Sequence, residues 1–483
     1  MRGKLVFLLI LAMLVGLVYL VGTRTRDAHV MPRPLPEEKP EASAPPVATG
    51  SMSASSPTAS EPAEASVTVD ARAPLLDRPL RIVASSWELA AALVVANGGT
   101  SSAGGSAMRA AGLEARVDTV TAPRDVEGQL ARGGADPAGA DVAVVPLPWL
   151  VTSFERIRAL EPRVVHVLGW SHGREVLFGS KDGVLSRPGS LAGDVSVFSD
   201  DPAATALALF ALDAAGTAAS HVRIVNDPKG APFAALARPL AGDRSPDLPT
   251  KVLLTTAEAS RLIPFVAVTA RGFVQEHAAA LAALLIAWDR GATQLQADVP
   301  AAARRIATEK NAPEPGALLE RLGWTVDPGR EDEGRVLGAS GGDGASTLDT
   351  LFRHEWQLLR DTGALTTPAP EGSLVDPGPY AAANPTTTAA PPVVVAPPGD
   401  GARVLLAQRV VKGDADAVAS RLAFLGGVFE RSALRITARP ATLAKEAADA
   451  ATSRYRVAPG RIVVATTPLA DAGVALIEVL ATP

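Results

Sequence analysis

Hydrophobic residues open the chain as an uninterrupted apolar run from Leu5 to Gly22, with basic residues on both sides of it. A helix of about 20 apolar residues is long enough to span the hydrocarbon core of a bilayer. A secretory signal would have a shorter apolar region followed by small residues at a cleavage site, and residues 19–23 (YLVGT) match that pattern poorly. We therefore expect residues 1–26 to form an uncleaved transmembrane anchor, with a cleaved signal as the alternative.

Periodic apolar positions are missing from two further segments, which divide the chain. Residues 27–78 are rich in Pro, Ala, Ser and Glu, and residues 367–400 are rich in Pro. Segments of this kind cannot bury a core and behave as extended linkers. The pattern therefore predicts a tether over 27–78, a body over 79–366, a linker over 367–400 and a small terminal domain over 401–483.

Within the body, short apolar and β-branched runs alternate with longer stretches of helical periodicity. The clearest helical stretches are 87–96, 202–215 and 273–290. The expected strands are 81–84, 116–120, 141–145, 164–168, 175–178, 195–198, 222–225 and 251–255. Strands that alternate with helices predict an α/β fold with a mainly parallel sheet covered on both faces. The body is too long for one such sheet, so we expect two α/β lobes.

Composition narrows the range of functions. The chain has a formal net charge of −5, so it lacks the basic excess with which nucleic-acid-binding proteins displace counterions. It contains no cysteine, which excludes disulfides, thiolate metal sites and a cysteine nucleophile. His166, His172 and His221 do not have the spacing of metal ligands. We therefore expect no nucleic-acid partner, no metal and no cofactor.

Six segments of the body follow one another in an order that resembles a known family. They are LRIVASSWELAAAL, ADVAVVPLPWL, VLGWSHGREVLFGSKDGV, LAGDVSVFSDDPAATALALFALDAAG, FVQEHAAALAALLIAW and TLDTLFRHEWQLLRDTGALT. In this order the body resembles the periplasmic substrate-binding proteins of ABC transporters, of the nitrate/sulfonate/taurine type. The resemblance implies two lobes that close on a small-molecule ligand, an ABC permease as partner, and no catalytic residue. It also implies a place in the bacterial cell envelope, facing the periplasm, where the anchor would hold the chain in the inner membrane.

Ligands of open α/β sheets bind beyond the carboxyl ends of strands, often at helix N-termini. Ser85, Ser86 and Trp87 follow the opening strand in this way. Their hydroxyls and the free amides of the next helix would hold a polar group, with Trp87 as an apolar wall. The alternative is that Ser85 and Glu88 form an S-x-x-E capping box, which satisfies the helix amides without a ligand.

A second candidate position is the start of the helix expected over 202–215, where Ser199, Asp201 and Thr205 lie. The adjacent carboxylates of Asp200 and Asp201 would repel an anion. We therefore expect a neutral or amine-bearing ligand here, and a capped helix without a ligand is the alternative.

A third candidate position is the proline-stiffened turn after the strand at 141–145. Pro148 and Trp149 lie in this turn, and Trp149 would line the cleft between the lobes. Burial of Trp149 in the core is the alternative.

An enzyme is the competing class, because residues 169–173 (GWSHG) match the G-x-S-x-G motif of α/β-hydrolases. That motif requires a helix directly after the serine, whereas residues 174–179 have the pattern of a strand. The histidines that would complete a triad, His277 and His354, lie in helical patterns. We therefore expect this segment to be a crossing between lobes, eased by glycine, and no enzyme.

The terminal domain shows a strand at 434–437, a helix at 442–455, the run VAPGRIVV and a closing strand at 474–480. This order resembles the second half of an outer-membrane-protein-A-like (OmpA-like) α+β domain. In that family an arginine holds the diaminopimelate carboxylate of peptidoglycan, and here Ala447 occupies its place. Alanine cannot form the bidentate pair that arginine makes. We therefore expect a degenerate domain that has lost peptidoglycan binding, with Arg439 or Lys445 as weak substitutes.

Two hypotheses follow for the whole chain. The first is a membrane-anchored, extracytoplasmic solute-binding protein that captures a small polar ligand between two lobes for ABC-type transport or sensing. The second is an envelope scaffold that keeps both folds but has an empty cleft and links the membrane with the cell wall.

Overall fold

The computed structural model describes residues 73–191, 193–237, 247–339, 346–383, 395, 401–411, 413–465, 471 and 473–481. All of them belong to a compact unit that extends from Thr68 to Pro483. The expected anchor, almost all of the tether and the second half of the Pro-rich linker lie outside the described residues. Within the described part, no helix is both long and apolar enough to cross a membrane.

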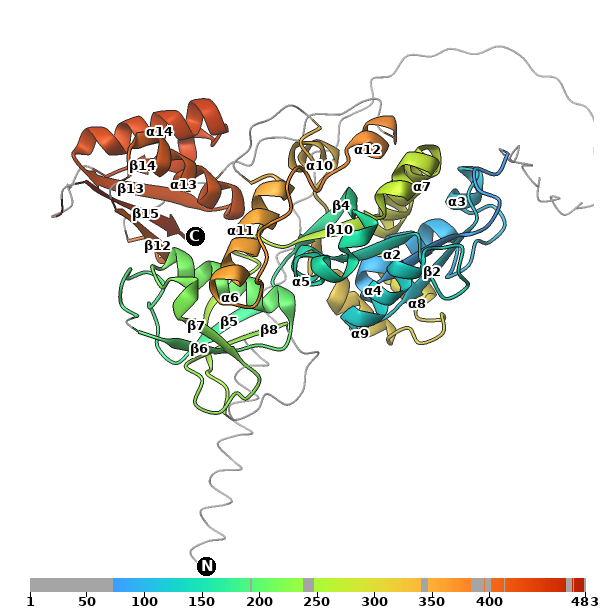
Figure 1. The fold of residues 1–483 in the computed structure, drawn as a ribbon, viewed down its shortest axis with the longest axis horizontal. Coiled ribbons are helices and arrows are strands. Elements are labelled where there is room, and N and C mark those ends of the chain that lie inside the picture. The colour runs from blue at the N-terminus through green and yellow to red at the C-terminus, as the bar shows by residue number, and fades with distance from the viewer. Residues whose placement is uncertain are drawn as a thin grey trace, which may run out of the picture. The chain divides into compact units, whose positions relative to one another are not determined.

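The first sheet has the strand order β11-β4-β10-β3-β1-β2. Figure 1 labels β2, β4 and β10 of this sheet. Its strands are β1 (Leu80–Ala84), β2 (Ala115–Thr119), β3 (Val142–Pro146), β4 (Arg163–Ser171), β10 (Pro264–Thr269) and β11 (Thr325–Val326). Strand β1 is parallel to β2 and β3, whereas β10 is antiparallel to both β3 and β4.

Helices cover both faces of the first sheet. They are α2 (Trp87–Asn97), α3 (Ala107–Ala110), α4 (Pro123–Arg132), α5 (Leu147–Ile157), α7 (Arg271–Ala297), α8 (Val299–Ile306) and α9 (Pro315–Leu322). Alternate residues of each strand point to opposite faces: Ile82 and Val144 pack with α2 and α7, and Val83 and Val145 pack with α4 and α5. Helices α2 and α7 approach so closely that a Cβ atom on Gly291 would lie 2.1 Å from the Ala92 carbonyl oxygen.

The second sheet has the order β7-β6-β8-β5-β9. Its strands are β5 (Glu175–Gly179), β6 (Val195–Phe198), β7 (Val222–Val225), β8 (Phe233–Ala237) and β9 (Lys251–Thr255). Helix α6 (Pro202–Ala214) packs on β5 and β8. The chain crosses between the two sheets twice, through residues 172–174 from β4 to β5 and through residues 256–263 from β9 to β10.

The expectation of an α/β body with two separate sheets is confirmed, but the expectation of mainly parallel sheets is wrong. Both sheets are mixed, since β5 is antiparallel to β8 and β9, just as β10 is to its neighbours. The reason is that β5 and β10 each follow a strand of the other sheet directly. No covering helix precedes them, as it would in a parallel β-α-β unit. A run of apolar residues indicates a buried strand but not its direction.

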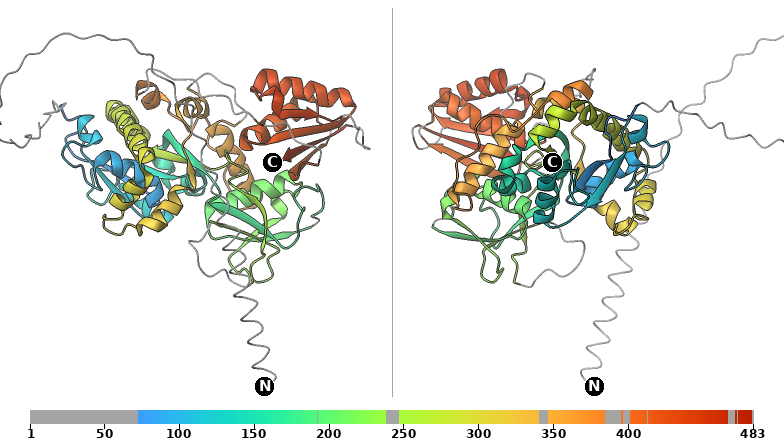
Figure 2. Two further views of the ribbon diagram at one scale, coloured as in Figure 1. Left: turned by 180° about the vertical axis from the view of Figure 1, so that it is seen from behind. Right: turned by 45° about the vertical axis from the view of Figure 1, so that its right-hand side comes forward.

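The third sheet belongs to the terminal domain and has the order β12-β15-β13-β14. Its elements are β12 (Val404–Val411), α13 (Ala415–Val428), β13 (Ala433–Arg439), α14 (Ala441–Tyr455), β14 (Ile462–Val464) and β15 (Val474–Leu480). The two helices pack side by side on one face of this sheet (Figure 2). Strand β12 and helix α13 were not expected from the sequence.

The three sheets share one continuous hydrophobic core. It joins Trp149 on α5, Phe210 on α6, Phe352 on α11 (Leu348–Asp361) and Phe424 on α13, all nearly inaccessible to solvent. The helices α5 and α6, which cover the first and the second sheet, are in direct contact. Two short helices, α10 (Arg330–Val336) and α12 (Gly378–Ala383), complete the described structure. The two α/β halves are therefore packed against each other through apolar side chains.

Helix α11 buries His354 between the rings of Phe210 and Phe424, with ring centroids 6.2 and 4.7 Å away. Burial, together with the nearby Arg421, lowers the pKa of His354 to about 4. The unfolded chain takes up a proton near pH 6.5, so stability is fully present above that pH and is lost as the pH falls towards 4. We expect the free energy of unfolding to drop by about 2 kcal/mol more in the wild type than in His354→Gln between pH 7 and 4.5. Urea unfolding at both pH values measures this, and equal losses in the two proteins would contradict it.

Candidate functional site

A buried charge cluster lies where the chain first crosses between the sheets. Its centre is Arg174, whose guanidinium is 3.8 Å from a carboxylate oxygen of Glu175 at the start of β5 and 4.0 Å from one of Glu88 on α2. The side chains of Glu88 and Glu175 are 3% and 0% exposed. Both distances exceed hydrogen-bonding range, so charge rather than direct hydrogen bonds holds Arg174 between an element of the first sheet and one of the second.

Carboxylates outnumber cationic groups in this cluster. Burial alone would lower the pKa of Arg174, but Glu175, Glu88 and Asp201 outweigh it and raise that pKa. Burial raises the pKa of Glu175, and Arg174 and the Ser171 hydroxyl only partly oppose that effect. One guanidinium thus faces three carboxylates in a region of low effective dielectric.

Hydrogen bonds fix one carboxylate oxygen of Glu175, whereas the other oxygen has no hydrogen-bond partner among the described residues. Oε2 accepts hydrogen bonds from the hydroxyls of Ser171 and Thr256, the latter at 3.2 Å. Oε1 of Glu175 lies 3.8 Å from Arg174 Nε but makes no hydrogen bond among the described residues, and Ser86 Oγ and His172 Nδ1 make none there either. Buried polar atoms nearly always have a partner in folded proteins. These atoms therefore mark the cluster as a place that a polar ligand would satisfy.

Ser85, Ser86 and Trp87 directly precede Glu88 of this cluster, and the capping expected as the alternative to a ligand is not observed. Helix α2 begins at Trp87, so Ser86 is the N-cap, and its side chain makes no capping bond. The S-x-x-E capping box is therefore wrong, because it would require Ser85 at that position. Trp87 is 8% exposed, and its Nε1 donates to the carbonyl oxygen of Asn311 at 3.0 Å.

Asp201 is the N-cap of α6, as the capped-helix alternative stated. Its Oδ1 accepts hydrogen bonds from the amides of Ala203 and Ala204 at 2.8 and 2.9 Å. The hydroxyls of Ser199 and Thr205 both donate to the Asp201 carbonyl oxygen, at 3.2 and 2.9 Å. The expected residues at this position are thus brought together, and Asp201 reaches the Arg174 cluster through its charge.

Pro148 and Trp149 lie in the first turn of α5 and not in a loop, because the helix begins directly after β3. Trp149 is 8% exposed and lines a crevice of about 20 Å³ between α4 and α5. This crevice is too small for a solute, since on the same measure one water molecule already needs about 10 to 15 Å³. The structure therefore gives Trp149 the position of a core residue.

The hydrolase-like segment is not followed by a helix, because β5 begins at Glu175. Ser171 is 1% exposed and donates to Glu175, while no hydrogen bond given for it in the described chain involves a histidine. His277 lies against Phe273 and His354 against Phe424. The expectation of a crossing between sheets is therefore met by the structure of residues 169–175.

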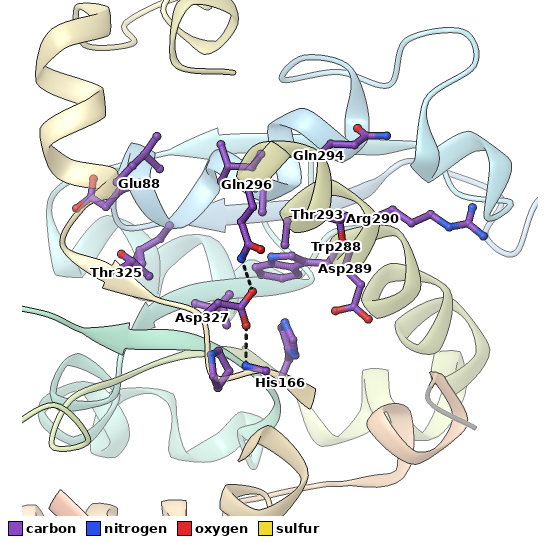
Figure 3. Close-up of a pocket in the computed structure, with 18 of the residues that line it drawn as sticks. Glu88, His166, Trp288, Asp289, Arg290, Thr293, Gln294, Gln296, Thr325 and Asp327 are labelled. Atoms are coloured by element: carbon purple, nitrogen blue, oxygen red, sulfur yellow. Dashed lines mark hydrogen bonds between the residues drawn. The ribbon is translucent and has the colours of Figure 1, made fainter. Parts of the chain in front are cut away.

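A larger cavity of about 950 Å³ lies on the first sheet, between α2, α7, α9, β4 and the loop after β11 (Figure 3). Its ionisable lining residues are Glu88, His166, Asp289, Arg290, Asp327 and Glu333. The Glu333 carboxylate is fixed by His166 Nδ1 and by the amide of Val167 at 3.2 Å. This cavity was not predictable from the sequence, because its walls come from segments that are far apart along the chain.

Comparison with known proteins finds no matching family model and no matching curated protein. Among solved structures, the chain is similar to the ligand-binding component of an ABC-type import system from Staphylococcus aureus with zinc bound, at 12% identity and a TM-score of 0.42 over 64% of this chain and 100% of that one. It is also similar to the periplasmic aliphatic sulphonate binding protein SsuA from Escherichia coli, at 13% identity and a TM-score of 0.42 over 67% and 97%. It is also similar to the periplasmic nitrate-binding protein NrtA from Synechocystis PCC 6803, at 10% identity and a TM-score of 0.36 over 61% of this chain and 91% of that one. All three of these neighbours are ligand-binding proteins.

Removal of Arg174 tests the charge cluster. We expect Arg174→Met to lower the free energy of unfolding at pH 7 by about 3 to 5 kcal/mol, because it leaves buried carboxylates without a cation. The deficit shrinks as the pH falls below 7, because burial raises the pKa of the Glu175 carboxyl and it takes up a proton in the folded state before it does in the unfolded chain. The double variant Arg174→Met/Glu175→Gln recovers part of the loss.

Arg116→Met is the matched control, because Arg116 forms an exposed ion pair with Asp118, and such pairs contribute no more than about 1 kcal/mol. Urea titrations of the four proteins measure the differences. Equal losses for Arg174→Met and Arg116→Met would show that the cluster does not carry the stability assigned to it.

Proposed function

We propose that this chain is an extracytoplasmic solute-binding protein that takes a small amine-bearing molecule at the Arg174 cluster, where the first and second sheets meet. The observation that carries the proposal is Oε1 of the fully buried Glu175, which faces Arg174 at 3.8 Å but accepts no hydrogen bond among the described residues, in a cluster of three carboxylates and one guanidinium. An ammonium group donates hydrogen bonds and adds the positive charge that this cluster lacks. A sulfonate or nitrate would meet Asp201, Glu175 and Glu88 at short range and be repelled.

Placement at the envelope is part of the same proposal. The apolar run at 5–22 would anchor the chain in the inner membrane, and the Pro-rich segment would hold the body on the periplasmic side. Delivery of the ligand to an ABC permease, or its detection by a sensor, would follow capture between the two sheets.

The scaffold hypothesis is the second candidate, and a specific observation favours it. The continuous apolar core joins both α/β sheets with the terminal domain, and a solute-binding protein would have to break part of it to open. Arg261 on the second crossing strengthens this union, since Nε donates to Glu430 of the terminal domain at 2.8 Å and Nη1 pairs with Asp332 at 2.5 Å. In this role the Arg174 guanidinium would occupy the place of a ligand permanently.

For the terminal domain we propose a degenerate OmpA-like fold without peptidoglycan binding. The order β13-α14-β14-β15 supports the fold, because it is the order that the resemblance implies. Ala447 is fully buried on α14, whereas Lys445 is exposed. A buried alanine offers no donor to a wall carboxylate.

A thermal-shift panel separates the two functions of the body. We expect primary amines to raise the melting temperature of the full chain by several degrees at concentrations far above Kd, because a ligand that binds only the folded state stabilises it. Sulfonates and nitrate should leave the melting temperature unchanged. Asp201→Asn keeps an acceptor for the α6 amides but removes the charge, so it should reduce the shift.

The control is Asp414→Asn, because Asp414 caps α13 through the amide of Ala417 at 2.8 Å. It should leave the amine shift intact. A panel in which no amine, amino acid, nitrate, nucleobase or sulfonate shifts the melting temperature would reject capture and favour the scaffold. A shift with anions alone would reject the amine.

A further inference from the structure

We propose that the cavity on the first sheet is a second binding site, independent of the Arg174 cluster, for an amine-bearing molecule with an apolar body. The cavity of about 950 Å³ is of the size that encloses small-molecule ligands. It combines an apolar wall with a set of carboxylates, and it lies within the first sheet and its helices rather than between the two sheets.

The apolar wall comes from residues of four elements. Leu89 on α2, Leu168 on β4, Ile286 and Trp288 on α7, and Leu319 and Leu322 on α9 line the cavity. Trp288 lies in the middle, with the ring of His166 4.9 Å away in an edge-to-face arrangement. Leu319 is 36% exposed, so apolar surface at the cavity remains in contact with water and would be covered by the body of a ligand.

The charges of the cavity favour a cation. Four carboxylates line it (Glu88, Asp289, Asp327 and Glu333), against one guanidinium. Figure 3 shows that guanidinium, on Arg290, directed away from Trp288 and Asp327. Glu88 faces Arg174 and Glu333 contacts His166, whereas Asp327 accepts hydrogen bonds from the neutral groups of Gln296 and Gly329. Asp327 is therefore the carboxylate whose charge the proposal assigns to a cationic ligand.

Two polar atoms at one end of the cavity have no hydrogen-bond partner within the part of the chain that the structure describes. Glu88 is 7% exposed and its Oε2 has no hydrogen bond, and Thr325 Oγ1 is buried and also has none. Figure 3 places both at the same end, opposite Asp289. The other oxygen of Glu88 faces Arg174 at 4.0 Å, so Glu88 has one oxygen available for this cavity without being taken from the Arg174 cluster.

Asp327 is positioned in the middle of the cavity by its own loop. Its Oδ1 accepts from the amide of Gly329 at 2.8 Å and its Oδ2 from Nε2 of Gln296 at 2.9 Å (Figure 3). Two fixed hydrogen bonds hold the carboxylate in place before a ligand arrives, which reduces the entropy lost on binding. A ligand ammonium near Asp327, with its apolar part against Trp288, would use both features of the cavity.

Isothermal titration of the full chain with phenethylamine and with 1,6-diaminohexane tests the proposal, with phenylacetate as the charge-inverted analogue. We expect the amines to bind and phenylacetate not to bind. Asp327→Asn should weaken amine binding about threefold to tenfold, the range for a partly exposed charge pair and for a more buried one. Leu319→Lys, which places a cation of the chain at the cavity, should weaken it at least as much.

The chain offers a matched control for each variant. Asp376 lies in a second Asp-Pro-Gly sequence, and its Oδ1 accepts from the Gly378 amide at 3.0 Å, so Asp376→Asn repeats the first change outside the cavity. Leu75 is 41% exposed, and Leu75→Lys repeats the second. Both controls should bind the amines like the wild type.

Three results would overturn the proposal: no heat of binding with either amine, amine binding unchanged in both Asp327→Asn and Leu319→Lys, or equal weakening in the controls. Asp201→Asn distinguishes this site from the Arg174 cluster. Amine binding that is lost in Asp201→Asn and kept in Asp327→Asn belongs to the Arg174 cluster and rejects the cavity site. Amine binding that is lost in Asp327→Asn and kept in Asp201→Asn supports the cavity site, even if the cluster takes no ligand.

Discussion

The charge of Arg174, which is 16% exposed and lies between the buried carboxylates of Glu88 and Glu175, is the constraint on which the arrangement of the body depends. Each of the three residues is attached to a different part of the fold: the first helix of the first sheet, the crossing segment and the first strand of the second sheet. Taking ions out of water is costly, and their attraction offsets that cost only when the geometry is kept. The crossing segment therefore cannot move without leaving a charge uncompensated. A change in the charge of the cluster would directly alter the position of one sheet relative to the other.

Two kinds of contact compete at this junction. The apolar core through Trp149, Phe210 and Phe352 holds the halves together without any need for a ligand. Glu175 Oε1 accepts no hydrogen bond from the described residues, so part of the favourable energy of closure is left unrealised. A binding protein would use this second feature, and a scaffold would depend on the first. Glu88, which faces Arg174 and lines the larger cavity, connects the two candidate sites physically.

Much of the fold was predictable from the local pattern of the sequence. The strands at 81–84, 141–145 and 195–198 and the helix after Asp201 lie within a residue or two of their expected positions, because apolar runs and capping residues are local signals. The direction of β10 and the shared core of three sheets were not predictable, since both depend on contacts between distant segments.

The candidate site was predictable only in part, for the same reason. Asp201 was recognised by its position before Pro202, but the partners of Arg174 lie on separate elements and no spacing rule joins them. The capping box failed because α2 begins one residue later than the motif requires. The cavity depends on the close approach of α2 and α7 at Gly291, and a single glycine within a helical pattern does not reveal what it approaches.

The most direct test of the account is the pKa of the Glu175 carboxyl group, followed by carbon-13 NMR of the full chain with Glu175→Gln for assignment. The account predicts a pKa above the ordinary value for glutamate, because burial outweighs Arg174, and a fall in that pKa when a primary amine binds. A pKa at or below the ordinary value, or one that does not respond to any amine that the chain binds, would contradict it.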